Sequence, residues 1–84
     1  MLEVQRILKM MTSDMLYKLF RISDLTDLEY KILQEFIIRE KPRDAICDDL
    51  GVSRSTFTNA KNIALTKIKI NLNNLLDEKI KQMG

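Results

Sequence analysis

The sequence has no histidine and no tryptophan, and it holds one cysteine, one proline and two glycines among 84 residues. Without histidine, the chain has no imidazole to serve as a general base, as part of a Ser-His-Asp triad or as a metal ligand. Its single cysteine, Cys47, excludes an intramolecular disulfide and a zinc site made of several cysteines. Phosphate-binding glycine motifs are also absent. We therefore expect no catalytic residue, no metal and no cofactor, and we expect that the protein is not an enzyme.

Long apolar runs are missing as well. The longest apolar runs are far shorter than the roughly 20 residues that a membrane-spanning helix needs. The N-terminus lacks the uninterrupted apolar core of a signal peptide. These absences predict a cytoplasmic protein without a membrane partner, and nothing in the sequence resembles a small-molecule sensor.

The residues that are present favour helices. Few helix breakers occur, and the chain is 45% hydrophobic and 31% charged, which is typical of a globular protein. We predict an all-α fold, a small single domain over residues 1–84 with four to five helices, a helix-turn-helix and a long C-terminal helix. A chain this short buries only roughly 60–65% of its unfolded surface, so association with another chain is a reasonable expectation.

Residues 1–24 are predicted to be helical because apolar side chains recur at steps of three and four. These apolar residues are Val4, Leu8, Met11, Met15 and Leu19. The Thr12-Ser13-Asp14 sequence in the middle is suited to begin a second, shorter helix. The pattern therefore leaves open whether residues 2–22 form one helix or two.

A capping box begins the next predicted helix. Thr26 stands at the N-cap and Glu29 three residues later, with Leu25 in the position of a hydrophobic staple. We expect this helix to end near Glu40. The residues that it is expected to bury are Leu28, Ile32, Leu33, Phe36 and Ile37.

A helix-turn-helix is predicted between Pro42 and Lys69. Proline is tolerated in the first turn of a helix, and a helix over residues 43–50 would be ended by Gly51 in a left-handed conformation. Ser53 is placed to cap the next helix, which meets no breaker before Gly84. The residues expected to form the turn and its small core are Ile46, Cys47, Leu50, Gly51, Val52 and Phe57, with Val52 as a buried plug. We interpret Cys47 as a small residue where two helices cross and not as a redox switch.

These residues carry a resemblance to a known family. The segments that carry it are Leu25-Thr26-x-x-Glu29-x-x-Ile32-Leu33, Ile46-Cys47-x-x-Leu50-Gly51-Val52-Ser53, Thr56-Phe57 and Ala64-Leu65-x-Lys67-Ile68. Together, residues 25–69 resemble region 4 of bacterial sigma-70-type factors and the related LuxR/GerE-type DNA-binding domain. Residues 70–84 then form a C-terminal helical extension. The resemblance implies that the second helix of the motif, residues 53–69, reads the major groove of duplex DNA.

The charge pattern agrees with that implication. Residues 50–76 contain no acid but hold Arg54, Lys61, Lys67 and Lys69, although the net charge of the chain is only +2. If the second helix reads DNA, Arg54 is suited to guanine and Asn59 to adenine. The full set of residues expected to contact DNA is Ser53, Arg54, Ser55, Thr58, Asn59, Lys61, Asn62, Lys41 and Arg43.

Two functions are compatible with this motif. The first is a sequence-specific transcription regulator that binds duplex DNA. The alternative is a protein-interaction module that keeps the helix-turn-helix shape and binds RNA polymerase or a phage or other multiprotein assembly, without specificity for bare DNA. Fold alone does not choose between them.

The ends of the chain carry more apolar surface than one short helix buries. Leu65, Ile68, Leu72 and Leu75 form a stripe on the last helix, and Leu76, Ile80 and Met83 continue on an adjacent face. The terminal helices either pack on each other within one chain or form a homodimer that places two recognition helices on DNA. We favour the homodimer because the core of so short a chain is thin.

Overall fold

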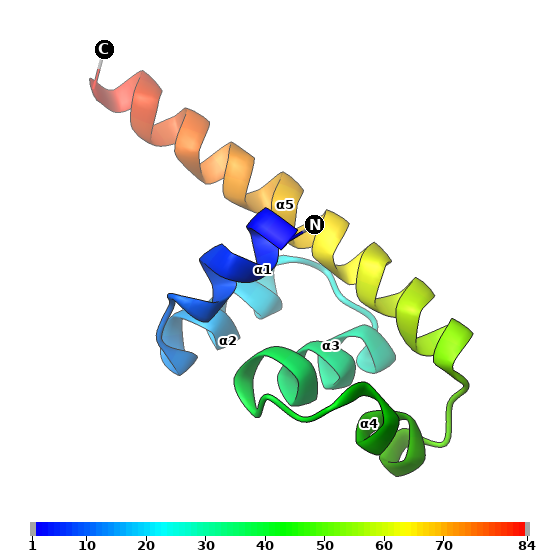
Figure 1. Cartoon of the computed structure of the whole chain (residues 1–84). Helices are drawn as coiled ribbons and strands as arrows, with labels where there is room; N and C mark the ends of the chain where they lie inside the picture. Colours follow the sequence, from blue (N-terminus) through cyan, green and yellow to red (C-terminus); the bar gives the residue numbers. More distant parts are fainter. Residues whose placement is uncertain (1, 84) are drawn as a thin grey trace.

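The structure is a computed structural model that describes the backbone of residues 2–83 and the side chains of residues 3–74. Its elements are helices joined by short turns and loops (Figure 1). The elements in chain order are α1 (Leu2–Lys9), α2 (Ser13–Ile22), α3 (Asp27–Leu33), the π-helical segment η1 (Gln34–Ile38), α4 (Arg43–Leu50) and α5 (Arg54–Met83). The described part of the chain contains no strand. The predicted all-α class and the long C-terminal helix are confirmed.

The N-terminal segment forms two helices. The hydroxyl of Thr12 accepts a hydrogen bond from the backbone N–H of Met15 at 3.3 Å, which makes Thr12 the N-cap of α2. The chain turns between Lys9 and Thr12, so α1 and α2 are separate elements. Of the two possibilities left open by the sequence, the structure adopts the one with an internal cap.

The predicted capping box is present at the start of α3. Thr26 Oγ1 accepts the Glu29 N–H at 3.2 Å, and Glu29 Oε1 accepts the Thr26 N–H at 3.0 Å. Beyond Leu33 the helix widens into η1, where the Arg39 N–H donates to the Gln34 carbonyl at 3.0 Å. Glu40 then has a left-handed φ of 55°, which ends the helix at the place that the sequence predicts.

Two apolar clusters hold the helices together. The larger cluster joins α1, α2, α3, η1 and the middle of α5; its buried residues are Val4, Leu8, Leu16, Leu19, Phe20, Leu33, Ile37, Ala64, Leu65 and Ile68. The smaller cluster consists of Ile32, Ile46, Cys47 and Phe57. The first two helices therefore pack on α5 within one chain, while Leu28 and Phe36 are only half-buried at the edges of these clusters.

Helix α5 runs along one side of the molecule and continues past the other helices toward its C-terminus (Figure 1). At 30 residues it is about 45 Å long, whereas the two shorter principal extents of the molecule are 21 Å. No helix in the described part of the chain has both the length and the apolar character needed to cross a membrane. The predicted contribution of Leu75, Leu76, Ile80 and Met83 to an apolar stripe lies outside the described side chains.

Candidate nucleic-acid interface

The turn between α4 and α5 has the conformation that the sequence predicts. Gly51 lies in the left-handed region with φ 67°, and the Val52 N–H donates to the Cys47 carbonyl at 3.1 Å. Ser53 Oγ then accepts the Thr56 N–H at 3.1 Å, so Ser53 caps the first turn of α5. The chain therefore passes from α4 into α5 through only three residues, Gly51, Val52 and Ser53.

The small core under this turn is built largely from the predicted residues. Ile46, Cys47 and Phe57 are buried in it, whereas Leu50 and Val52 are half-buried, so Val52 covers the edge of the core and is not the buried plug we expected. Helix α3 contributes a residue that the motif did not include, Ile32, which is fully buried. Each of the two helices thus packs on α3 as well as on its partner.

Aromatic contacts extend this core toward η1. The Phe36 and Phe57 rings meet edge to face, with centroids 5.8 Å apart and planes at 76°. Lys61 Nζ lies 5.4 Å from the Phe36 centroid and 5.9 Å from that of Phe57. Lys61 is consequently half-buried, and its ammonium interacts with the faces of two core rings.

The other predicted contact residues of α5 lie mostly on its surface. Thr58 is half-buried, and the remaining side chains are exposed: Ser53, Arg54, Ser55, Asn59 and Asn62. Since Phe57 and Ala64 point into the core, Thr58, Asn59 and Asn62 between them lie toward the outer side of the same helix, whereas Lys61 lies over the core rings. The predicted contact residues of α5 thus lie together on its first turns, and this part of the helix is exposed to solvent.

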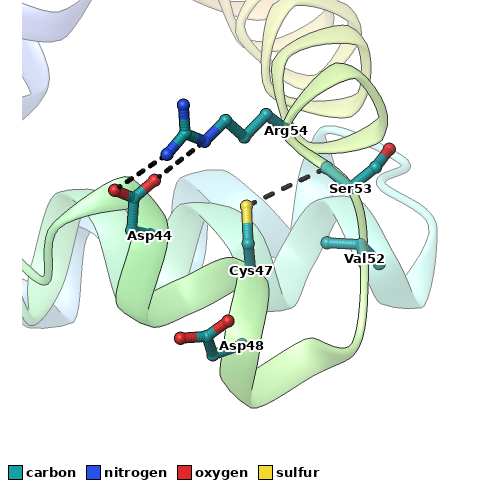
Figure 2. Close-up of a pocket in the computed structure, with 6 residues that line it drawn as sticks. All are labelled: Asp44, Cys47, Asp48, Val52, Ser53 and Arg54. Atoms are coloured by element: carbon teal, nitrogen blue, oxygen red, sulfur yellow. Dashed lines mark hydrogen bonds and ion pairs between the residues drawn. The ribbon is translucent and has the colours of Figure 1, made fainter.

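Acidic side chains pair with three of the predicted cations. Arg54 Nε lies 3.2 Å from Asp44 Oδ1, and Arg54 Nη2 donates to Asp44 Oδ2 at 3.3 Å (Figure 2). Arg43 Nε lies 3.5 Å from the same carboxylate. Lys41 Nζ lies 3.0 Å from Glu35 and 3.3 Å from Asp49, and hydrogen bonds to these two carboxylates raise the pKa of the Lys41 ammonium. The sequence predicts the cations but not these partners, because the pairs of Lys41 and Arg54 depend on how α4 meets η1 and α5.

A shallow depression of about 430 Å³ lies between α4 and the start of α5. Its lining residues are Asp44, Cys47, Asp48, Val52, Ser53 and Arg54 (Figure 2). Cys47 is one of these lining residues and is largely buried, with Sγ 3.9 Å from the Ser53 carbonyl. The position of Cys47 agrees with its interpretation as a small residue between two helices.

A second polar cluster ties the middle of α5 to the loop before α3. Lys67 Nζ donates to Glu29 Oε1 at 2.7 Å and to the Asp24 carbonyl at 3.2 Å. Asn71 Nδ2 donates to Ser23 Oγ at 3.0 Å and to the Ile22 carbonyl at 3.1 Å. Lys67 is thus engaged inside the protein, although the charge pattern had placed it with the cations of the acid-free stretch.

Glu29 is nearly buried, and its ionisation reflects two opposing influences. Burial works to raise the pKa of its carboxyl, but the hydrogen bonds from Lys67 and from the Thr26 N–H, together with the charge of Lys67, outweigh it. The pKa of Glu29 is therefore held below its usual value of 4.5. The cluster lies along the middle of α5 and ties that helix to α3 and to the loop before it.

Comparison with known proteins does not assign the chain to a family: no family model, no curated protein and no solved structure matches it.

Proposed function

We propose that the protein is a transcription regulator that binds duplex DNA through its helix-turn-helix, with the first turns of α5 in the major groove. The observation that carries the proposal is the exposed polar surface at the start of α5, on a helix that is anchored through Phe57 and Lys67. Arg54 and Asn59 are the residues proposed to read base edges, through bidentate contacts to guanine and adenine. Ser53, Ser55, Thr58, Lys61 and Asn62, with Lys41 and Arg43 from the preceding segment, are proposed to contact phosphates or the groove walls.

The cap at Ser53 supports this arrangement. The first backbone N–H groups of a helix carry a partial positive charge, and α5 has no acidic residue in its first turn to oppose a phosphate there. Helix α5 is also long enough for its first turns to enter a groove while residues 64–68 remain in the core.

Selection from a pool of random duplexes tests the proposal. We expect enrichment of a defined sequence, and we expect Arg54→Ala and Asn59→Ala each to weaken binding to that sequence by about 1–3 kcal/mol. Asn74→Ala is the matched control, because Asn74 is an exposed asparagine on the same helix, about four turns beyond Asn59. If the Arg54 and Asn59 variants both bound the selected duplex as the wild type does, the recognition surface would be assigned wrongly.

The ion pairs favour a second candidate, a protein-interaction module that binds RNA polymerase or a multiprotein assembly. Asp44, Asp48 and Asp49 make the exposed side of α4 acidic, and two of these three pair with cations beside the turn. An acidic surface next to the recognition helix repels phosphates and attracts a basic protein surface. Two results together would establish this second function in place of the first. The protein would associate stoichiometrically with a partner after nuclease treatment, and it would not bind bare duplex at low salt.

A homodimer through the terminal helices is the partner that we propose in addition to DNA. An apolar groove of about 270 Å³ is lined by Met11, Met15, Lys18, Leu19, Ile22 and Leu72. Met15 and Ile22 are 52% and 59% exposed there. Leu72 is the residue that α5 contributes to this groove, and the sequence beyond it has apolar residues at 75, 76, 80 and 83. A second copy has the same groove and the same helix. About a two-fold axis, the helix of each copy would therefore cover the groove of the other.

Sedimentation velocity tests the dimer. We expect a dimer for the wild type and a monomer for Ile22→Asp, with Ile63→Asp as the control because Ile63 is 53% exposed on α5 outside the groove. A wild type that stays monomeric over the whole accessible concentration range would contradict the dimer.

A further inference from the structure

We propose that Asp44 is a specificity-determining residue that positions Arg54 for base recognition. The inference rests on the proposed DNA binding and deepens it, because it assigns a role to an acid that a DNA-binding surface would otherwise be expected to avoid. Asp44 belongs to α4 and Arg54 to the first turn of α5, so the contact crosses the turn of the motif (Figure 2).

The geometry of the contact fixes the guanidinium. Both carboxylate oxygens of Asp44 are used, one at 3.2 Å from Arg54 Nε and the other 3.3 Å from Nη2. Arginine is planar, so two parallel contacts set the orientation of the whole group, and they leave Nη1 and further N–H groups for a second partner. A guanine presents two acceptors, N7 and O6, to such a fork.

Within this contact the two arginines outnumber the acid. Asp44 also lies 3.5 Å from Arg43 Nε, so one carboxylate stands between two guanidiniums and the three groups together carry a single positive charge. Asp44 therefore organises two arginines without cancelling their attraction for DNA. All three side chains are exposed, so a ligand can reach them.

Ordering Arg54 before binding lowers the cost of recognition. A long side chain that is free in solution loses conformational freedom when it is held at an interface, and restraining it beforehand removes part of that loss. A charge that only repelled phosphates would weaken binding to every duplex alike. In contrast, a residue that positions Arg54 changes the ratio of specific to nonspecific affinity.

Asp48 provides a matched control for the charge. It lies one turn further along α4, lines the same depression and is exposed, yet Figure 2 shows its carboxylate pointing away from Arg54. Asp44→Asn and Asp48→Asn remove the same charge from the same helix. Only the first removes the ionic contact to Arg54.

The experiment compares these two variants with the wild type on the duplex selected from the random pool and on a scrambled duplex, at matched salt. We expect Asp48→Asn to strengthen binding to both duplexes by a similar factor and so to keep their affinity ratio. We expect Asp44→Asn to lower the ratio by roughly 2- to 12-fold. Asp44→Glu keeps a carboxylate and should therefore retain part of the affinity ratio that Asp44→Asn loses. In an Arg54→Ala background, Asp44→Asn should have no further effect on the ratio.

The outcomes separate the two proposals. If the wild type prefers the selected duplex but Asp44→Asn and Asp48→Asn change the affinity ratio equally, Asp44 acts as a charge alone and the positioning role is overturned. If the wild type binds no duplex at low salt, the proposed function itself is wrong, and the inference is lost with it. Thermal unfolding of each variant confirms that the comparison is made between folded proteins.

Discussion

Two ion pairs join α5 to acids on other helices, and they differ in burial more than in chemistry. The Lys67–Glu29 pair lies in the middle of the helix, where the Glu29 side chain is 6% exposed and the Lys67 side chain 34%. The Arg54–Asp44 pair lies at the start of the helix, where the two side chains are 68% and 62% exposed. Water screens the attraction between the charges of the Arg54–Asp44 pair. Water is largely excluded from the Lys67–Glu29 pair, so its charges are screened less and its hydrogen bonds take the place of those to water.

The difference indicates separate roles along one helix. Glu29 takes part in the capping box of α3 and also accepts from Lys67, so it connects the start of α3 with α5. Asp44 contacts an exposed arginine at the surface, where an ion pair usually contributes little to folding. The middle of α5 is therefore built for stability, and its start is available for a ligand.

Removing the Glu29 charge should produce the largest loss of stability. Glu29→Gln keeps a group that can accept from the Thr26 N–H, as glutamine does in capping boxes, but it leaves Lys67 without its carboxylate. We expect the free energy of unfolding to fall by about 1.5–3 kcal/mol, the usual contribution of a hydrogen bond to a charged group. Glu29→Ala should cost more, since it also removes the cap bond. Urea unfolding measures the loss of stability for both Glu29 variants. If Glu29→Gln and Asp44→Asn lowered the free energy of unfolding equally, the two ion pairs would not differ in their contribution to stability.

The same pair should make stability depend on pH at the acidic side. Because the pKa of Glu29 is lowered in the folded protein, its contribution is present above the ordinary glutamate pKa of 4.5 and is lost as the pH falls through the lower folded value. Lys67→Met removes the partner that lowers this pKa, so the acid-dependent part of the stability should shrink. Urea titrations at a series of pH values, fitted for the wild type and this variant, give the comparison. Identical pH profiles would show that Lys67 has no influence on Glu29.

The turn offers a change that touches neither ion pair. Gly51 has φ 67°, and a Cβ added there would meet no heavy atom within 4 Å. Gly51→Ala should therefore cost about 1–2 kcal/mol from the left-handed backbone alone. We expect the loss in urea unfolding to be independent of pH between pH 4 and 7, unlike the loss at Glu29. Gly51→Asn is the control, because asparagine tolerates this conformation better than alanine and should destabilise less.

Breaking the exposed pair should have the smallest effect on folding. Asp44→Asn should change the free energy of unfolding by less than about 1 kcal/mol, as is usual for exposed ion pairs, and the change should diminish further in salt. The measurement is thermal or urea unfolding at low and high salt, with Asp48→Asn beside it. A loss as large as that of Glu29→Gln would mean that Asp44 is a structural residue and would weaken the argument for its role in recognition.

Local chemistry made much of the fold predictable. The capping box at Thr26 and Glu29, the left-handed Gly51 and the cap at Ser53 each depend on residues within a few positions of one another, and each is present as expected. The division of residues 2–22 stayed open because the Thr12 cap competes with a continuous apolar stripe, and the structure settles it in favour of the cap.

What the sequence did not predict depends on how the helices meet. Glu29 and Lys67 are 38 residues apart, so nothing local links them. Asp44 and Arg54 are only ten residues apart, but their contact requires the particular crossing of α4 and α5. Val52 is half-buried at the edge of a core whose buried residues include Ile32 from α3, a residue outside the motif. The widening of the helix over η1 also had no recognisable pattern in the sequence.

The most direct test of the account is a salt titration of the wild-type protein on a short duplex, begun at low ionic strength. If the start of α5 lies against DNA, the protein binds at low salt and the logarithm of its affinity falls linearly with the logarithm of the salt concentration, by a slope of about 0.9 for each phosphate neutralised. Absence of binding at the lowest salt concentration would contradict DNA recognition and leave the protein-interaction module as the function to pursue.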